Sequence, residues 1–405
     1  MSGSSGGNFG RPPEQQPLPP QAHVRSPRRS SVGFTIFLAV AMLLGACAMA
    51  FILLASGAPN ALVIGTVLAA LPLGPLIACF MWLDRYEPEP RALILAALGW
   101  GAVVATTIAF FLQLIDQVAF STSAALSGSI VAPLTEEAAK GIFVVLLLFA
   151  RRHELDGILD GIVYAGMVGI GFAFTENILY LASAYMGGDG IGPGGIEAAT
   201  GTFVERGIFS PFAHPFFTAL IGVGVGYAVV TRSGLWRVIA PVLGYGAAVL
   251  AHALWNGSLF LGGGQFFVLA YVFAMVLAFL MFVGFAVWAR RREGQMLTRA
   301  LNDCAARGFL GYHEVPWLVR LPARRESRRF AKEHGGPEAL RAMREYQQQA
   351  VELGFLHDRY LRGTAPPDFA ERGQAMVDHM SALQPNVRFP QLPGRTLPNQ
   401  GAPLE

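Results

Sequence analysis

Charged side chains are scarce in this sequence. Asp, Glu, Lys and Arg together account for 14% of its 405 residues, and 53% are hydrophobic. Soluble globular domains carry about a quarter charged residues. The shortage is confined to one region, because residues 1–33 and 290–405 are polar while the sequence between them is apolar with short breaks. The composition therefore excludes an ordinary soluble domain and predicts an all-α, polytopic membrane protein embedded in a lipid bilayer.

The sequence also has few cysteines, a small net charge and no repeat between its two apolar halves. The three cysteines, Cys47, Cys79 and Cys304, are scattered, and two of them fall in apolar runs. This pattern excludes a disulfide framework and a zinc–thiolate site. The formal net charge of +3 is small, and we expect no nucleic-acid partner. No repeat relates the first half of the apolar region to the second half, whereas many transporters are built from such repeats.

Eight apolar runs follow one another, each of about 20 residues, the length that a membrane-spanning helix needs. They cover residues 34–55, 60–83, 92–115, 128–150, 158–185, 208–231, 238–261 and 266–288. The breaks between them alternate in charge. One set holds Arg85, Arg91, Arg151, Arg152, Arg232, Arg237, Arg290, Arg291 and Arg292, and the other set, which includes a glycine-rich loop over 186–207, holds only Arg206.

An excess of Lys and Arg marks the cytoplasmic side of a membrane protein. The alternation therefore predicts a multi-pass protein of the cell membrane with both termini in the cytoplasm. We expect a disordered cytoplasmic leader over residues 1–33 and a transmembrane domain over 34–289. A small cytoplasmic helical tail should follow over 290–405, with helices near 337–353 and 370–383 and a loose end after about residue 385.

Ionisable residues inside the apolar runs are the most informative feature. Glu136, Glu137 and Lys140 stand in the fourth run, where each costs at least a few kcal/mol to insert. The next three runs add Glu176, Asn177, His214, His252 and Asn256. Counted at about 1.5 Å per residue from the end opposite the arginines, the glutamates and histidines lie roughly 9–14 Å deep, and Asn256 lies about one turn shallower than His252. This agreement predicts one polar pocket shared by four helices, in the outer half of the bilayer.

The spacing of these residues predicts their orientation. Glu136 and Lys140 are four residues apart and can pair on one helix face. Glu137 is turned by about 100° from Glu136, which leaves it free to face water. His252 and Asn256 are also four residues apart and should share a face.

Backbone features of these runs give three further expectations. Pro215 follows His214 directly, so the sixth helix should be irregular there. Asp156 and Asp160 stand at the start of the fifth run and should cap its helix. The glycines of the fifth and sixth runs should allow close helix packing; they include Gly166, Gly169, Gly171, Gly222, Gly224 and Gly226.

Several functions fit carboxylates and histidines gathered in a membrane. A carboxylate can activate water as a general base while His or Asn donors hold the oxyanion. Alternatively, His214, His252 and a carboxylate such as Glu176 could bind zinc, although the sequence has no H-E-x-x-H motif. Buried carboxylates and histidines also serve proton- or ion-coupled transporters, and charges of this kind in a non-catalytic scaffold can fix helix packing.

The order of the motifs resembles the PrsW family of intramembrane proteases, which is related to the CAAX protease and bacteriocin-processing superfamily. The resemblance is carried by Glu136-Glu137-x-x-Lys140, Phe172-x-x-x-Glu176-Asn177, His214, His252-x-x-x-Asn256 and the break Asp84-Arg85-Tyr86-Glu87-Pro88-Glu89-Pro90. It covers about residues 34–288. Glu176 stands where the wider superfamily has His.

The resemblance implies an endopeptidase that cleaves a membrane-anchored protein, such as an anti-sigma factor, near the outer face of the membrane. The expected catalytic residues are Glu136, Glu137, Glu176, His214, His252 and Asn256, with Lys140 and Asn177 as orienting residues. Glu137 is the preferred base, because Lys140 can occupy Glu136. Zinc is the candidate cofactor, with Glu176, His214 and His252 as candidate ligands. Metal-independent hydrolysis and a transporter stay open as alternatives.

Overall fold

The computed structural model of the protein describes residues 28–55, 57–188, 193–261 and 263–390. Regular structure in these residues is entirely helical, which confirms the all-α prediction. The α-helices are α1 (Arg28–Ala55), α2 (Pro59–Ala70), α3 (Leu73–Leu83), α4 (Arg91–Gly99), α5 (Thr106–Ile115), α6 (Ala124–Leu126), α7 (Ala132–Ala150), α8 (Ile158–Met186), α9 (Gly195–Phe203), α10 (Ala213–Val230), α11 (Gly234–Leu261), α12 (Gly263–Ala270), α13 (Leu277–Ala306), α14 (Val315–Val319), α15 (Leu321–Leu361) and α16 (Phe369–Leu383).

Shorter helical turns connect several of these helices. Wider, π-helical turns are η1 (Trp100–Ala105), η2 (Asp116–Phe120), η3 (Ser127–Val131), η5 (Val204–Phe209) and η6 (Tyr271–Val276), and 3₁₀ turns are η4 (Arg152–Glu154) and η7 (Gln384–Asn386). Two of the π-helical turns lie just before helices of the candidate site: η3 leads directly into the helix that carries Glu136, and η5 ends three residues before the helix that carries His214. Such turns are frequent at functional sites.

Seven helical segments of the described chain are long and apolar enough to cross a membrane. They are Val32–Ala55, Pro59–Leu83, Arg91–Phe120, Ile158–Met186, Gly195–Val230, Gly234–Phe260 and Gln265–Ala306. The remaining predicted run corresponds to α7, whose 19 residues give it a length of about 28 Å. Every 18-residue stretch of α7 contains Glu136, Glu137 and Lys140, whereas each of the seven segments has an apolar stretch of that length with at most two charged residues. The chain is therefore a multi-pass membrane protein with seven apolar spans in its described part, and the predicted count of eight is reached only when α7 is counted with them.

The prediction of a loop over residues 186–207 is wrong. Residues 186–207 were expected to form a glycine-rich connection, but most of the described part is helical, in α9 and η5. The sixth span accordingly runs from Gly195 to Val230. The irregularity expected near Pro215 occurs just before it, because the helix is interrupted around Ser210 and α10 restarts at Ala213. Pro215 therefore lies in the first turn of α10, where its missing N–H breaks no helical hydrogen bond.

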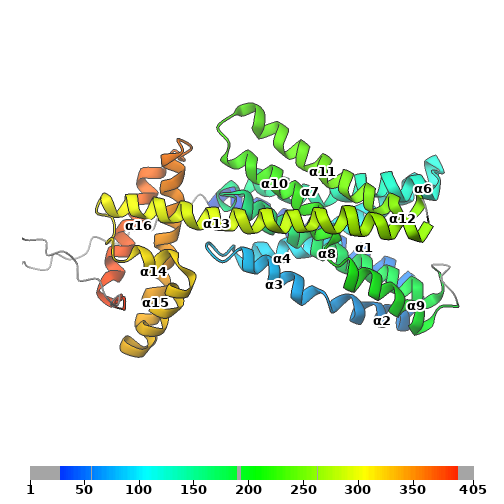
Figure 1. Ribbon diagram of the computed structural model, residues 1–405, viewed down its shortest axis with the longest axis horizontal. Helices are drawn as coiled ribbons and strands as arrows, with labels where there is room; N and C mark the ends of the chain where they lie inside the picture. The colour runs from blue at the N-terminus through cyan, green and yellow to red at the C-terminus, as the bar shows by residue number, and fades with distance from the viewer. Residues whose placement is uncertain (1–27, 56, 189–192, 262, 391–405) are drawn as a thin grey trace, which may run out of the picture.

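The helices of the membrane region run alongside one another, and α14, α15 and α16 form a separate group at one end (Figure 1). We call this the tail-side end, and the opposite end, with α6, α9 and α12, the far end. The helix α13 joins the two regions and continues to Ala306, beyond the predicted limit at residue 288. The tail has a hydrophobic core of its own, which includes Leu297, Leu318 and Tyr346.

The two helices predicted in the tail are present. Within α15 the chain takes a non-helical conformation at Gly336 (φ 69°), a left-handed backbone that glycine adopts at low cost. The helix restarts at Pro337, as predicted, and α16 spans Phe369–Leu383. Most of the disordered leader predicted over residues 1–33, and most of the loose end predicted after 385, lies outside the described residues, but α1 already begins at Arg28, so the predicted limit of the leader at residue 33 is wrong.

Glycines bring α8 into direct backbone contact with its neighbours. A Cβ on Gly161 would lie 2.1 Å from the carbonyl oxygen of Gly222 in α10, and one on Gly171 would lie 1.9 Å from the carbonyl oxygen of Leu98 in α4. A Cβ on Gly169 would lie 2.7 Å from the carbonyl oxygen of His214. The expected packing role of these glycines is thus confirmed, and it places His214 against α8.

Polar contacts fasten the tail-side end. The Asp160 carboxylate accepts hydrogen bonds from the backbone N–H groups of Asp156 (2.6 Å) and Gly157 (2.8 Å), so Asp160 caps α8 as predicted. Asp156 instead forms an ion pair with Arg359 of α15 at 2.8 Å. Arg324 donates to the carbonyl oxygen of Tyr86 at 2.9 Å. The tail is therefore attached both to the start of α8 and to the break between α3 and α4.

Replacement of Gly161 by Ala tests the backbone contact between α8 and α10. Because the new methyl group would meet the Gly222 carbonyl, the two helices must separate, and we expect the free energy of unfolding to fall by about 1–3 kcal/mol. Unfolding of the purified protein in mixed detergent measures this change. Gly246→Ala is the control, since a Cβ there meets no atom within 4 Å. Equal stability of the two variants would contradict the proposed packing role.

Candidate active site

Lys140 is the centre of a buried polar cluster built from four helices. Its side chain is fully buried, and its ammonium group lies 2.8 Å from Glu137 Oε1 and 3.3 Å from Glu136 Oε2. It also lies 3.1 Å from His214 Nδ1 and 3.8 Å above the centre of the Phe172 ring. Lys140 thus links α7 with α8 and α10, and the predicted convergence of polar groups is present.

Glu137 is the more enclosed of the two adjacent carboxylates. Its side chain is fully buried. One oxygen accepts from Lys140 and lies 3.0 Å from His252 Nδ1, and the other accepts from the Thr218 hydroxyl at 3.0 Å. The expectation that Glu137 is free to face water is therefore wrong. Lys140 is three residues from Glu137 and four from Glu136, so it reaches both, and its shorter contact is with Glu137.

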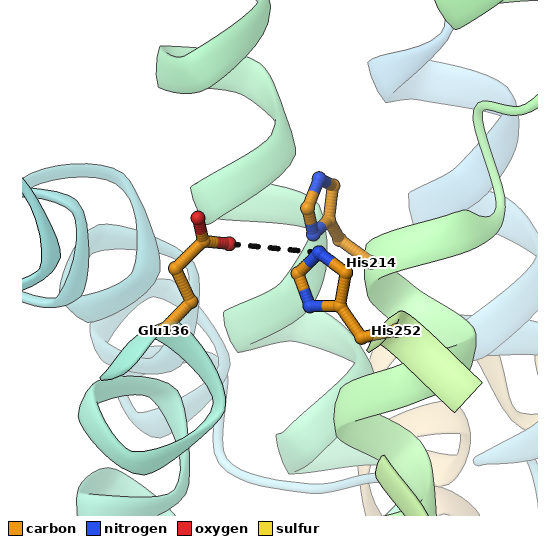
Figure 2. A group of neighbouring side chains, drawn as sticks. All are labelled: Glu136, His214 and His252. Carbon is orange, nitrogen blue, oxygen red and sulfur yellow. Dashed lines mark ion pairs between the residues drawn. The ribbon is translucent and has the colours of Figure 1, made fainter. Parts of the chain in front are cut away.

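Glu136 is the carboxylate that faces open space. It lines a cavity of about 370 Å³ together with Glu176, His214, His252 and Asn256. Gln113 of α5 donates a hydrogen bond to Glu136 Oε1 at 3.1 Å. Figure 2 shows the Glu136 carboxylate directed toward the rings of His214 and His252, and the distance from Glu136 Oε2 to His252 Nε2 is 3.9 Å.

Each histidine is held by a carboxylate on one ring nitrogen. Glu137 faces Nδ1 of His252, and Glu176 Oε2 lies 2.8 Å from Nε2 of His214. A carboxylate accepts a hydrogen bond from the nitrogen that it faces. These contacts therefore favour the tautomers with Nδ1–H on His252 and Nε2–H on His214. The other nitrogen of each ring then directs a lone pair toward Glu136 and Lys140.

Glu176 and Asn177 are joined by a cation. Arg206, from η5, donates through Nη2 to Glu176 Oε2 and through Nε to Asn177 Oδ1 at 2.7 Å. Its guanidinium group lies 3.9 Å from the centre of the Tyr180 ring. The predicted orienting residue Asn177 therefore contacts Arg206 and lines a second cavity, of about 330 Å³.

Asn256 connects the cluster to η3. Its side-chain amide donates to the Gly128 carbonyl oxygen at 2.9 Å, and Asn256 lines both cavities. His252 and Asn256 therefore share a face of α11, as predicted. The two cavities are adjacent, because Arg206, His214 and Trp255 also line both of them.

Three residues of the site were not predicted. Gln113 and Thr218 are uncharged polar residues in apolar runs, and nothing in the local sequence indicates which way they face. Arg206 was assigned to a loop outside the membrane. One feature of the sequence could have indicated its role: Arg206 is the only basic residue in the predicted breaks on the outer side of the membrane.

The cluster includes a set of atoms suited to a metal ion. Glu136, His214 and His252 each offer one ligand atom, and these atoms lie within 4.8 Å of one another. Two histidines and one carboxylate form a known ligand set of catalytic zinc, and carboxylates that orient such histidines are typical of zinc sites. Two of the expected ligands, His214 and His252, belong to the set. Glu176 is not part of this set; it contacts Nε2 of His214, whereas Nδ1 of the same ring faces Lys140.

Lys140 limits how such an ion could bind. Its ammonium group contacts Glu136 Oε2 and His214 Nδ1, which belong to two of the three candidate ligands. A dication and an ammonium group cannot both hold these atoms. The donor set therefore fits a metal ion provided that Lys140 keeps only its contact with Glu137.

Lys140→Met tests whether the ammonium group stabilises the cluster. Removing one partner of a buried ion pair leaves an uncompensated charge, and we expect a loss of about 3–5 kcal/mol in the free energy of unfolding. Unfolding in mixed detergent measures the loss. The double variant Lys140→Met/Glu137→Gln should recover part of it, because it also removes the carboxylate closest to the ammonium group. Wild-type stability of Lys140→Met would rule out this role.

Comparison with known proteins agrees with this geometry. Residues 89–285 match the model of a family described as "PrsW family intramembrane metalloprotease". The chain is 31% identical over 153 residues to protease PrsW of Geobacillus kaustophilus, covering 38% of this chain and 61% of that protein. It is 30% identical over 149 residues to protease PrsW of Oceanobacillus iheyensis, covering 37% and 62%. No solved structure matches the chain.

A third relative is protease PrsW of Bacillus subtilis, 29% identical over 106 residues, or 26% of this chain and 48% of that protein. The chain thus spans about half to three fifths of the length of these curated relatives. The matched family region contains every residue of the buried cluster, from Gln113 to Asn256. Over residues 89–285, just under half of the chain, the sequence is therefore similar to the PrsW family of proteases.

Proposed function

We propose that the protein is an intramembrane endopeptidase that hydrolyses a peptide bond of a membrane-anchored protein. The observation that carries this proposal is the position of Glu136, a carboxylate that lines a cavity of about 370 Å³ within the membrane-spanning bundle and faces two oriented histidines. The names of the curated relatives, protease PrsW, support the reaction class.

The position of the cluster supports cleavage near the outer face of the membrane. Glu136 lies in the second turn of α7, and the opposite end of that helix runs into Arg151 and Arg152. With the arginine-rich side in the cytoplasm, both described ends of the chain are cytoplasmic and the cavity is in the outer half of the cell membrane. A membrane-anchored regulator such as an anti-sigma factor is the proposed substrate.

Glu136 is the proposed general base. It removes one proton from a water molecule while the water oxygen bonds to the scissile carbonyl carbon. The resulting tetrahedral intermediate collapses as the carbon–nitrogen bond breaks. Glu136 then returns the proton to the leaving amine, so that one water molecule is consumed and no net proton is gained. Glu137 is proposed to hold Lys140 and His252 in place and not to contact the water.

Two groups of the chain can stabilise the developing oxyanion. The Asn256 amide has two N–H groups, and only one is needed for its bond to Gly128. The second is available to the cavity that Asn256 lines. Lys140 contributes a fixed positive charge beside Glu136. Charges and donors fixed in a site with little water are the largest contributors to many enzymatic rates.

A metal ion is compatible with the same site. Glu136, His214 and His252 would hold it, with Glu176 and Glu137 orienting the two histidine rings. When bound, zinc would supply Lewis-acid polarisation of the scissile carbonyl group. Lys140 would then neutralise Glu137 alone.

The lack of internal repeats favours a protease over a transporter. Many transporters are built from two related halves, and no repeat relates the first half of the apolar region to the second half. A separate cavity of about 250 Å³ at the tail-side end is lined by Glu87, Glu89, Asp156 and Asp160, among others, and shares no lining residue with the cavity beside Glu136.

Glu136→Gln tests the proposed base. The amide cannot accept the proton of water, so cleavage of a membrane-tethered reporter should fall by about 10²- to 10⁴-fold, with little change in stability. Glu137→Gln is the matched comparison. Because Glu137 contacts Lys140, His252 and Thr218, its replacement should reduce both cleavage and stability. Full cleavage by both variants would eliminate the proposed enzyme activity.

Metal content tests the second part of the proposal. We expect the purified chain to bind one zinc ion in equilibrium dialysis, and His252→Gln to abolish this binding because it removes a ligand. Glu176→Gln should weaken binding by roughly 10- to 100-fold, because Glu176 orients His214 without being a proposed ligand. Full reporter cleavage in the presence of a strong chelator, by protein shown to hold no zinc, would exclude a metal requirement.

A further inference from the structure

We propose that Arg206 is a positioning residue of the active site, which fixes Glu176 and through it the ring of His214. This inference rests on the proposed function. Arg206 comes from η5 (Val204–Phe209), a π-helical turn between α9 and α10. It is the one cation besides Lys140 that contacts the cluster in the described part of the chain.

The contacts of Arg206 use the shape of its guanidinium group. Nε donates to Asn177 Oδ1 and Nη2 donates to Glu176 Oε2, so one planar group holds two consecutive residues of α8. The same group lies 3.9 Å from the centre of the Tyr180 ring, one helical turn further along. A lysine cannot make the two directed bonds and the stacking contact at once, because it has a single nitrogen.

Glu176 connects Arg206 to His214 and so fixes the orientation of the His214 ring. The carboxylate oxygen that accepts from Arg206 also lies 2.8 Å from Nε2 of His214. With Nε2 held, the other nitrogen, Nδ1, lies 3.1 Å from the Lys140 ammonium group. The position of the His214 lone pair beside Lys140 therefore depends on Arg206, which acts through Glu176 and has no hydrogen bond or ion pair to Lys140 among the described residues.

Arg206 also balances the negative charge of the cluster. The cluster contains three carboxylates, Glu136, Glu137 and Glu176, and Lys140 contacts only the first two. Arg206 supplies the cation for the third. The side chain of Arg206 is 22% exposed and lines both cavities, so its charge is placed where the bundle opens and its desolvation cost is reduced.

The test compares Arg206→Gln, Arg206→Lys and Glu205→Gln in the full-length protein. Glu205 is the matched control, because it lies in the same turn and lines only the second of the two cavities. With a membrane-tethered peptide reporter, we expect kcat of Arg206→Gln to fall roughly 10- to 100-fold. KM should change by less than about twofold, because the substrate is still bound.

The charge-conserving variant separates positioning from simple charge balance. Arg206→Lys should recover only part of kcat, because it restores the cation without the two directed bonds. Detergent unfolding must show that the variants remain folded. Wild-type kcat in Arg206→Gln, or an equal loss in Glu205→Gln, would overturn the proposal.

A measurement that does not depend on activity distinguishes this inference from the proposed function. The chain has 8 histidines, so ¹⁵N-histidine NMR in micelles can follow single rings, with His214→Gln used to assign the His214 signal. We expect this signal to shift in Arg206→Gln and to stay unchanged in Glu205→Gln. A shift in a protein that cleaves no reporter would support the positioning role and refute the proposed protease. An unchanged signal in Arg206→Gln would overturn the positioning role whatever the activity.

Discussion

The ion pair between Lys140 and Glu137 is the interaction on which the rest of the site depends. Both side chains are fully buried, 2.8 Å apart, in a helix that lies among membrane spans. A charge in such a place is expensive unless it is paired. Glu137 also contacts His252 and Thr218. The pair therefore connects α7 to α10 and α11, and of the two adjacent carboxylates of α7 it leaves Glu136 beside the cavity.

Small residues make this polar cluster geometrically possible. Hydrogen bonds near 3 Å between side chains of different helices require helix axes that are held close, and in a membrane small residues provide this. Gly169 touches the backbone at His214, while Gly161 and Gly222 meet near the tail-side end. The backbone contact between α8 and α10 thus fixes the distance over which Glu176 reaches His214. Packing and chemistry are coupled at the same pair of helices.

The sequence predicts the spans and the polar cluster, but it does not predict which role each residue of the cluster has. Hydropathy and buried charge are local properties, so the runs and the convergence of Glu136, Glu176, His214 and His252 could be inferred. The roles of Glu136 and Glu137 depend on which face of α7 turns toward α10, because Lys140 is close to both in sequence. Arg206 was missed for a related reason: it enters the site only because η5 is helical, and a glycine-rich sequence predicts a loop there.

The charge at the centre of the cluster also limits its chemistry. The lone pairs of His214 and His252 and the carboxylate of Glu136 converge in an arrangement that suits a dication. The Lys140 ammonium group contacts two of the same three residues. Because like charges repel strongly where water is scarce, an ion can enter only as Lys140 withdraws to Glu137. The Lys140–Glu137 pair thus joins three helices, and under the proposed function its position would decide whether Glu136 serves as a free base or as a metal ligand.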